Sequence, residues 1–221
     1  MTHDRLAFLV RHGAVHNPTG IRYGRLQGFS LSAEGRTQIQ RAADALAALR
    51  RRSPDAAPQT SPMSAAHRRA IGGPVRVVAS PLERAVESAT IIADALGAGP
   101  VETDARLIEA RSTFDGLRYR RDALAHLRRW LTAAERDERP SEIAARMRDA
   151  LIELSGDQPL VIVSHQLPIQ YLRMSVERPE RAPRPWHERP SCETASITAL
   201  RVSVDSTPRI QVDSRFAVRD E

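Results

Sequence analysis

Lysine is absent from this chain of 221 residues, and its 33 arginine-or-lysine positions are all arginine. The absence excludes two classes of chemistry, because Schiff-base enzymes need a lysine amine and Walker-type nucleotide hydrolases need the P-loop lysine. Arginine stays charged at physiological pH and donates paired hydrogen bonds to phosphate oxygens. A phosphate site in this chain would therefore be built on arginine.

Cysteine is nearly absent, since Cys192 is the single one in the sequence. One cysteine excludes an internal disulfide and the paired cysteines of a zinc site. The sequence also contains neither His-Glu-x-x-His nor an acidic cluster of the kind that holds magnesium. We therefore expect no metal, no other cofactor and a reducing, cytoplasmic setting, with Cys192 packed as a small hydrophobe.

Long apolar runs and aromatic side chains are also scarce. No run approaches the roughly 20 residues that a membrane helix needs, and residues 1–5 open a strand rather than a signal peptide. Only 4% of residues are aromatic, so few side chains could stack on bases, and the arginines behind the net charge of +6 are scattered. We expect neither a membrane nor a nucleic-acid partner.

The size and composition indicate one globular domain. Hydrophobic residues make up 41% of the chain and charged residues 27%, which is ordinary for a soluble protein with a sizeable core. We therefore interpret residues 1–221 as a single domain. Residues 51–74 have almost no apolar anchors and are interpreted as an exposed insertion.

The N-terminal apolar run is the first sign of a site. Residues 6–10 are all apolar and lead directly into Arg11, His12 and Gly13. Such a run is typical of a buried strand in a parallel sheet, and ligands of open α/β sheets bind at the carboxyl ends of the strands. Arg11 and His12 would then stand at the mouth of a site, with Gly13 allowing a close approach of the backbone.

Two later stretches repeat this design. Residues 75–79 are apolar except for Arg76 and are expected to form a second strand, followed by Ser80-Pro81 and by Arg84 in the first turn of an expected helix, where an anion is favoured. Residues 160–163 form a further run of four apolar residues, followed by Ser164, His165 and Gln166. Hydrophobic spacing predicts helices from Ser32 to about Arg50, from Leu82 to about Leu96, and over residues 117–136, 141–154 and 169–176. Strands are predicted over residues 197–204 and 209–212, and a proline-rich loop over residues 178–191.

In this order, Arg11-His12-Gly13, Ser80-Pro81 with Arg84, and Ser164-His165 resemble the motifs of the histidine phosphatase superfamily, the phosphoglycerate-mutase-like proteins. The resemblance extends from Leu6 to about Leu200. It implies an α/β fold, a three-layer α/β/α arrangement around a central, mostly parallel sheet.

The resemblance also implies roles for particular residues. His12 corresponds to the nucleophile, and Glu109 to the general acid for the leaving group, with Asp115 as a second acidic candidate. Three further residues would hold the phosphoryl group: Arg11, Arg84 and His165. Phosphate- or substrate-binding roles are implied for Asn17, Arg25, Gln27, Gly28 and Thr194, with Ser196 beside it.

The function expected from these parts is a metal-independent phosphatase that forms a phosphohistidine on His12 and acts on a small phosphorylated molecule. A phosphoglycerate-type mutase would use the same residues. A non-catalytic phosphate-binding module is the third hypothesis, since Ala14 and Gln166 stand where the family usually has an acidic residue and a glycine. The sequence selects neither a substrate nor an oligomeric state.

Overall fold

The computed structural model describes residues 4–51, 73–118, 128, 137–177, 192–203 and 209–216. Three sequence expectations fall wholly or mostly outside these ranges: the 51–74 insertion, the 117–136 helix and the 178–191 loop.

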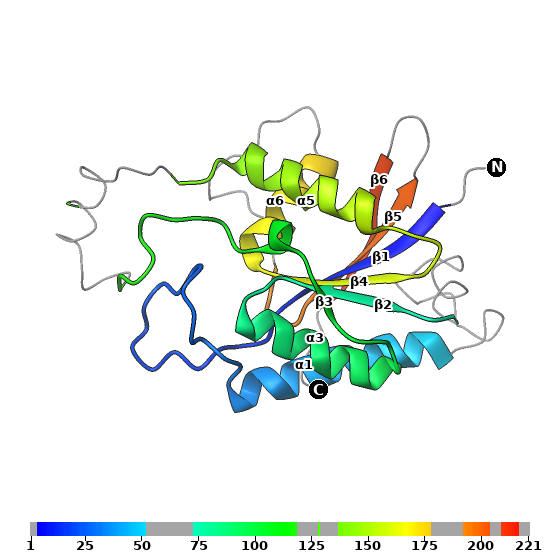
Figure 1. Ribbon diagram of the computed structural model, residues 1–221, viewed down its shortest axis with the longest axis horizontal. Helices are drawn as coiled ribbons and strands as arrows, with labels where there is room; N and C mark the ends of the chain where they lie inside the picture. Colours follow the sequence, from blue (N-terminus) through cyan, green and yellow to red (C-terminus); the bar gives the residue numbers. More distant parts are fainter. Residues whose placement is uncertain are drawn as a thin grey trace.

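One six-stranded sheet forms the centre of the molecule (Figure 1). Its strands stand in the order β3 (Glu102–Thr103), β2 (Arg76–Ala79), β4 (Leu160–Ser164), β1 (Asp4–Arg11), β5 (Ile197–Ser203) and β6 (Arg209–Phe216). The first four strands are parallel, while β5 runs antiparallel to β1 and β6 antiparallel to β5. The predicted mostly parallel sheet is confirmed.

The register brings the three motif-bearing strands level at their carboxyl ends. Arg11 on β1 is paired with Ser164 on β4, and Val163 on β4 lies opposite Ala79 on β2. The residues that follow these strands therefore emerge at one edge of the sheet, as the motif order predicted.

Among the described residues, two helices cover each face of the sheet. Residues Leu6, Phe8 and Val10 belong to the core cluster shared with α1 (Ala33–Arg51) and α3 (Glu83–Leu96). The alternate residues Ala7 and Leu9 belong to the cluster shared with α5 (Pro140–Leu154) and α6 (Gln166–Glu177). Figure 1 shows the resulting three layers, which confirm the expected α/β/α architecture.

The element boundaries agree with the sequence expectations to within a few residues. Ser32 caps α1, since its hydroxyl accepts from the Gly35 N–H at 3.0 Å. A 3-10 turn (η1, Ala105–Leu107) follows β3 and precedes the segment that carries Glu109. The helix α6 begins at Gln166, three residues before the expected start, and β6 continues to Phe216. Within the described ranges, no helix has the length and apolarity to cross a membrane.

Two glycines allow the start of α1 to pack directly on the loop after β1. A Cβ added to Gly13 would lie 2.3 Å from the carbonyl oxygen of Gly35, and one on Gly35 would lie 1.9 Å from that of Ala14. Neither approach leaves room for a side chain. This backbone contact fixes the chain immediately after His12.

Candidate active site

Four cationic or titratable side chains meet at the carboxyl edge of the sheet. Arg11 ends β1 and His12 follows it, Arg84 is in the first turn of α3, and His165 joins β4 to α6. His12, Arg84 and His165 are each no more than 1% exposed. The two imidazole rings lie 5.1 Å apart, centroid to centroid, at an interplanar angle of 62°. The predicted convergence of these residues is present.

The imidazole of His12 is oriented through both nitrogens. Its Nδ1 lies 2.7 Å from the carbonyl oxygen of Gly13, and its Nε2 lies 3.3 Å from Nε of Arg84. A carbonyl only accepts and a guanidinium only donates, so the proton sits on Nδ1 and the lone pair on Nε2. Burial, and then the charge of Arg84, lower the pKa of His12 to about 3. His12 is thus a neutral imidazole, the form that acts as a nucleophile.

Arg84 is held by the loop that follows β1. Its Nη2 donates to the carbonyl of Gly24 at 2.5 Å, and its guanidinium carbon lies 4.8 Å from the centre of the Tyr23 ring. Tyr23 in turn stacks on Phe29 with 5.3 Å between ring centroids. Sequence reasoning did not identify Tyr23 as part of the site.

His165 and Arg11 each keep one buried nitrogen without a hydrogen-bond partner among the described residues. Nε2 of His165 lies 2.7 Å from the Ser80 hydroxyl, while its Nδ1 is unsatisfied. Arg11 donates from Nη1 to the carbonyl of Cys192 at 2.6 Å, while its Nε is unsatisfied. Buried polar atoms are rarely left in this state, and an anionic ligand would satisfy both. Burial and then the neighbouring His12 lower the pKa of His165 well below its usual value.

The segment before β5 lies against the Arg11–His12 backbone. The Ala195 N–H donates to the carbonyl of Arg11 at 3.0 Å, and the Arg11 N–H donates to that of Ser196 at 3.1 Å. These bonds bring the half-buried Thr194 to the edge of the site. Cys192 is buried in the core as expected, and burial raises the pKa of its thiol.

Glu109 lies close enough to the site for the charges of Arg84 and Arg11 to act on its carboxyl. Burial raises the pKa of Glu109 above its ordinary value, and the hydrogen bond from the Ala110 N–H, followed by these two charges, opposes the rise only in part. One carboxyl oxygen accepts from the Ala110 N–H at 2.8 Å. The net result is a carboxyl group that keeps its proton to a higher pH than usual. Such a group can donate a proton to a leaving group.

The second acidic candidate, Asp115, is engaged in the loop instead. Its carboxylate accepts from the Arg25 N–H at 3.0 Å and pairs with Nε of Arg22 at 3.3 Å. It also lies where a side chain on Gly24 would have to stand. These contacts make Asp115 a brace for the loop that holds Arg84.

Two of the predicted substrate-binding residues have partners within the protein. The Asn17 amide closes its own loop by donating to the Ile21 carbonyl at 2.8 Å and accepting from the Ile21 N–H at 3.3 Å. Arg25 donates from Nε to the carbonyl of Glu109 at 2.7 Å and pairs with Glu138 at 2.8 Å.

Gln27 and Gly28 are exposed, and their contact with substrate stays a prediction, as does that of Thr194. Gln166, the departure from the family glycine, is the half-buried first residue of α6.

The structure adds residues that the motifs did not reveal. Ser88 accepts from the Gly13 N–H at 3.3 Å and donates to the Arg84 carbonyl at 2.7 Å, which links the two motif regions. Glu138 and Arg146 brace the Glu109 segment. Among the residues described, no three or more histidine, cysteine or acidic side chains form a group that could hold a metal ion.

The sequence matches the model of the "Histidine phosphatase superfamily (branch 1)" over residues 7–75 and 64–211. It is 39% identical over 213 residues to an uncharacterised protein of Mycobacterium tuberculosis, covering 90% of this chain and 91% of the relative.

Solved structures share the fold. A mycobacterial glucosyl-3-phosphoglycerate phosphatase in complex with VO3 superimposes with a TM-score of 0.66 at 26% identity, covering 95% of this chain and 97% of that one. A protein described as mycobacterial hydrolase 2 gives a TM-score of 0.67 at 24% identity, with 96% and 90% covered.

Proposed function

Since the chain belongs to the histidine phosphatase superfamily, we propose that it hydrolyses phosphate monoesters through a phosphohistidine on His12, without a metal ion. The observation that carries the proposal is the state of His12. Its Nδ1–H is bound to Gly13, its Nε2 lone pair faces the guanidinium of Arg84, and its lowered pKa keeps it neutral. A nucleophile for phosphorus needs an unprotonated nitrogen, and this state of His12 provides one beside a cation.

In the first step, Nε2 of His12 attacks phosphorus. The N–P bond forms while the P–O bond to the leaving group breaks, and the oxygen takes the electron pair of that bond. The protonated carboxyl of Glu109 supplies the proton that makes the leaving group a neutral alcohol.

In the second step, water attacks the phosphohistidine. The P–O bond to water forms as the N–P bond breaks, and its electron pair returns to Nε2 of His12. Glu109, now a carboxylate, takes the proton from water and is ready for another cycle. Inorganic phosphate leaves.

Arg11, Arg84 and His165 would hold the transferring group through both steps. Phosphoryl transfer relies mainly on positioning and on offsetting the charge of the equatorial oxygens. The unsatisfied Nε of Arg11 and Nδ1 of His165 support this role, because each is a buried nitrogen that a phosphoryl oxygen or hydroxyl could satisfy.

We further propose a small phosphorylated molecule as substrate and a cytoplasmic site of action, with no nucleic-acid or membrane partner. The scattered arginines, the scarcity of aromatic residues and the single buried cysteine support this setting.

The test compares wild type with His12→Ala on 4-nitrophenyl phosphate in the presence of a chelator. We expect wild type to release phosphate at a rate that the chelator leaves unchanged, and the variant to lose this activity. Acid-labile incorporation of labelled phosphate into wild type, absent from the variant, would identify the phosphohistidine. Turnover that persists in His12→Ala would contradict the mechanism.

Two further outcomes separate the alternatives. A wild type that isomerises phosphoglycerate faster than it releases phosphate would be a mutase. A wild type that binds vanadate without turning over any phosphate ester would be a binding module.

A further inference from the structure

The segment that carries Glu109 lacks regular structure of its own at this residue, and side chains from elsewhere hold its backbone. The 3-10 turn η1 ends at Leu107, two residues earlier. The carbonyl of Leu107 accepts from the Ser164 hydroxyl at 2.7 Å, that of Arg106 accepts from Arg146, and that of Glu109 accepts from Nε of Arg25 at 2.7 Å. Two of these three supports are arginines.

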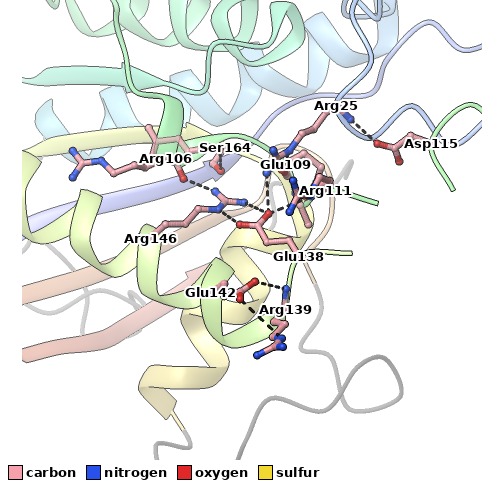
Figure 2. A network of polar contacts seen from close by, with 12 residues as sticks. Arg25, Arg106, Glu109, Arg111, Asp115, Glu138, Arg139, Glu142, Arg146 and Ser164 are labelled. Atoms are coloured by element: carbon pink, nitrogen blue, oxygen red, sulfur yellow. Dashed lines mark hydrogen bonds and ion pairs between the residues drawn. The ribbon is translucent and has the colours of Figure 1, made fainter. Parts of the chain in front are cut away.

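Glu138 joins the two arginines. Its Oε2 accepts from Nη2 of Arg25 at 2.8 Å, and its Oε1 accepts from Nε of Arg146 at 2.6 Å (Figure 2). It also bonds to the Glu109 segment directly, since its Oε2 accepts from the Arg111 N–H and its own N–H donates to the Arg111 carbonyl, both at 3.2 Å. Glu138 thus contacts every arginine-borne support of the segment.

The charge of Glu138 is needed for the arrangement. The side chains of Arg25 and Arg146 are only 33% and 17% exposed, and that of Glu138 is 12% exposed. Burial would raise the pKa of Glu138, but the hydrogen bonds and charge of Arg146, then the Arg111 N–H and the charge of Arg25, hold it below its ordinary value. Without the carboxylate, two poorly hydrated guanidinium groups would face each other unpaired.

Glu138 is separate from the capping contact at the N-terminus of the neighbouring helix, α5. The capping contact of α5 runs from the Arg139 N–H to Glu142 at 2.9 Å, and the Glu142 side chain is 56% exposed. Figure 2 shows this pair beside the Glu138 network, with its own contacts. Glu142 is therefore a matched control: an acidic residue at the same helix start that does not touch the Glu109 segment in any contact described.

We propose that Glu138 is a positioning residue for proton transfer: through Arg25 and Arg146 it fixes the backbone that presents the Glu109 carboxyl to the leaving group. The inference rests on the function proposed above. It gives Arg25 a role that the sequence did not suggest, as a support of the acid instead of a ligand for phosphate.

Comparing substrates with different leaving groups gives a test that distinguishes impaired proton transfer from a loss of protein stability. Phenolate needs a proton to leave, since phenols of the tyrosine type have a pKa near 10, whereas 4-nitrophenolate is a stable anion. For Glu138→Gln we expect kcat/KM to fall about 100-fold on phenyl phosphate and less than about threefold on 4-nitrophenyl phosphate. Glu142→Gln should keep the wild-type ratio between the two substrates, with folding of each variant checked by its melting temperature.

A double-mutant cycle tests the route through Glu109. If Glu138 acts only by placing the acid, Glu109→Gln combined with Glu138→Gln is no slower on phenyl phosphate than Glu109→Gln alone. Losses that multiply, or an equal fall on both substrates in Glu138→Gln, would overturn the proposal. A wild type inert on both esters would instead overturn the proposed function itself, and this inference with it.

Discussion

The pKa values of His12 and Glu109 move in opposite directions, and this difference suits the separate roles proposed for them. Burial and two arginines lower the pKa of His12 to about 3, while burial raises that of Glu109. Burial favours the neutral form of either group, which for imidazole is the nucleophile and for a carboxyl is the acid. Burial therefore favours, in each group, the protonation state that its proposed role requires.

This arrangement predicts the pH dependence of kcat/KM. Because the proposed mechanism requires a protonated Glu109, activity should fall as pH rises through its raised pKa, while His12 stays neutral far into the acid range. The profile on phenyl phosphate checks this expectation. The ionisation of phenyl phosphate affects the Glu109→Gln variant and the wild type equally, so the variant should lose only the part of the activity decline that comes from the enzyme. A decline that is unchanged in the variant would belong to a group other than Glu109.

Arg84 offers a second prediction at this scale. Its guanidinium contacts His12, Gly24 and the Tyr23 ring, and lysine cannot make these contacts together. Arg84→Lys should reduce kcat/KM by about 100- to 1000-fold, the usual cost of one lost charge-stabilising donor. Arg36→Lys, at the exposed end of an ion pair with Glu87, is the control and should leave kcat/KM unchanged.

Residues that directly follow strands could be predicted from the sequence. Residues that contact one another across a large separation in the sequence could not. The placement of His12, Arg84 and His165 was predictable because apolar stretches mark strands whose ends meet, and the resemblance of the motifs supplied their expected roles. Glu138 was not, because its partner Arg25 is 113 residues away and the chain has 33 arginines. A guanidinium also binds carboxylate and phosphate with the same geometry, so the sequence could not tell which anion Arg25 would meet.

At the scale of elements, the contact between the β1 loop and α1 sets the position of His12. Gly35 lies in the first turn of α1, where alanine would ordinarily be preferred by about 1 kcal/mol. Here Gly35→Ala should instead destabilise the fold by about 1–3 kcal/mol, because its Cβ would meet the Ala14 carbonyl. Urea unfolding measures the difference. Gly156→Ala, where a Cβ meets no atom within 4 Å, should be neutral or stabilising.

Element existence was easier to predict than element ends. The strands β1, β2 and β4 are buried on both faces, so their apolar runs were unambiguous. The start of α5 was expected at Ser141, a common capping residue, but the helix begins at Pro140 after Arg139. Proline suits a first helical position because its missing N–H has no partner there, and this outweighed the preference for serine.

At the scale of the whole molecule, two buried histidines make the fold sensitive to acid. The pKa values of His12 and His165 are lowered on folding, so the unfolded chain binds more protons as pH falls below about 6.5. The stability linked to these groups is complete above that pH and is lost as pH falls toward their folded-state values. Each histidine should contribute a slope of about 1.4 kcal/mol per pH unit to the free energy of unfolding.

Urea unfolding between pH 6 and pH 5 isolates this effect, because most carboxylates of the unfolded chain titrate below that range. Glu109 contributes to this pH slope with the opposite sign, because a carboxyl whose pKa is raised on folding lowers the free energy of unfolding as pH rises. Both proteins in the comparison should therefore carry Glu109→Gln. Adding His12→Asn should then lower the slope by about 1.4 kcal/mol per pH unit, the share of one histidine. An unchanged slope in that variant would mean that His12 takes up its proton in the folded protein, and such a histidine could not be the neutral nucleophile proposed here.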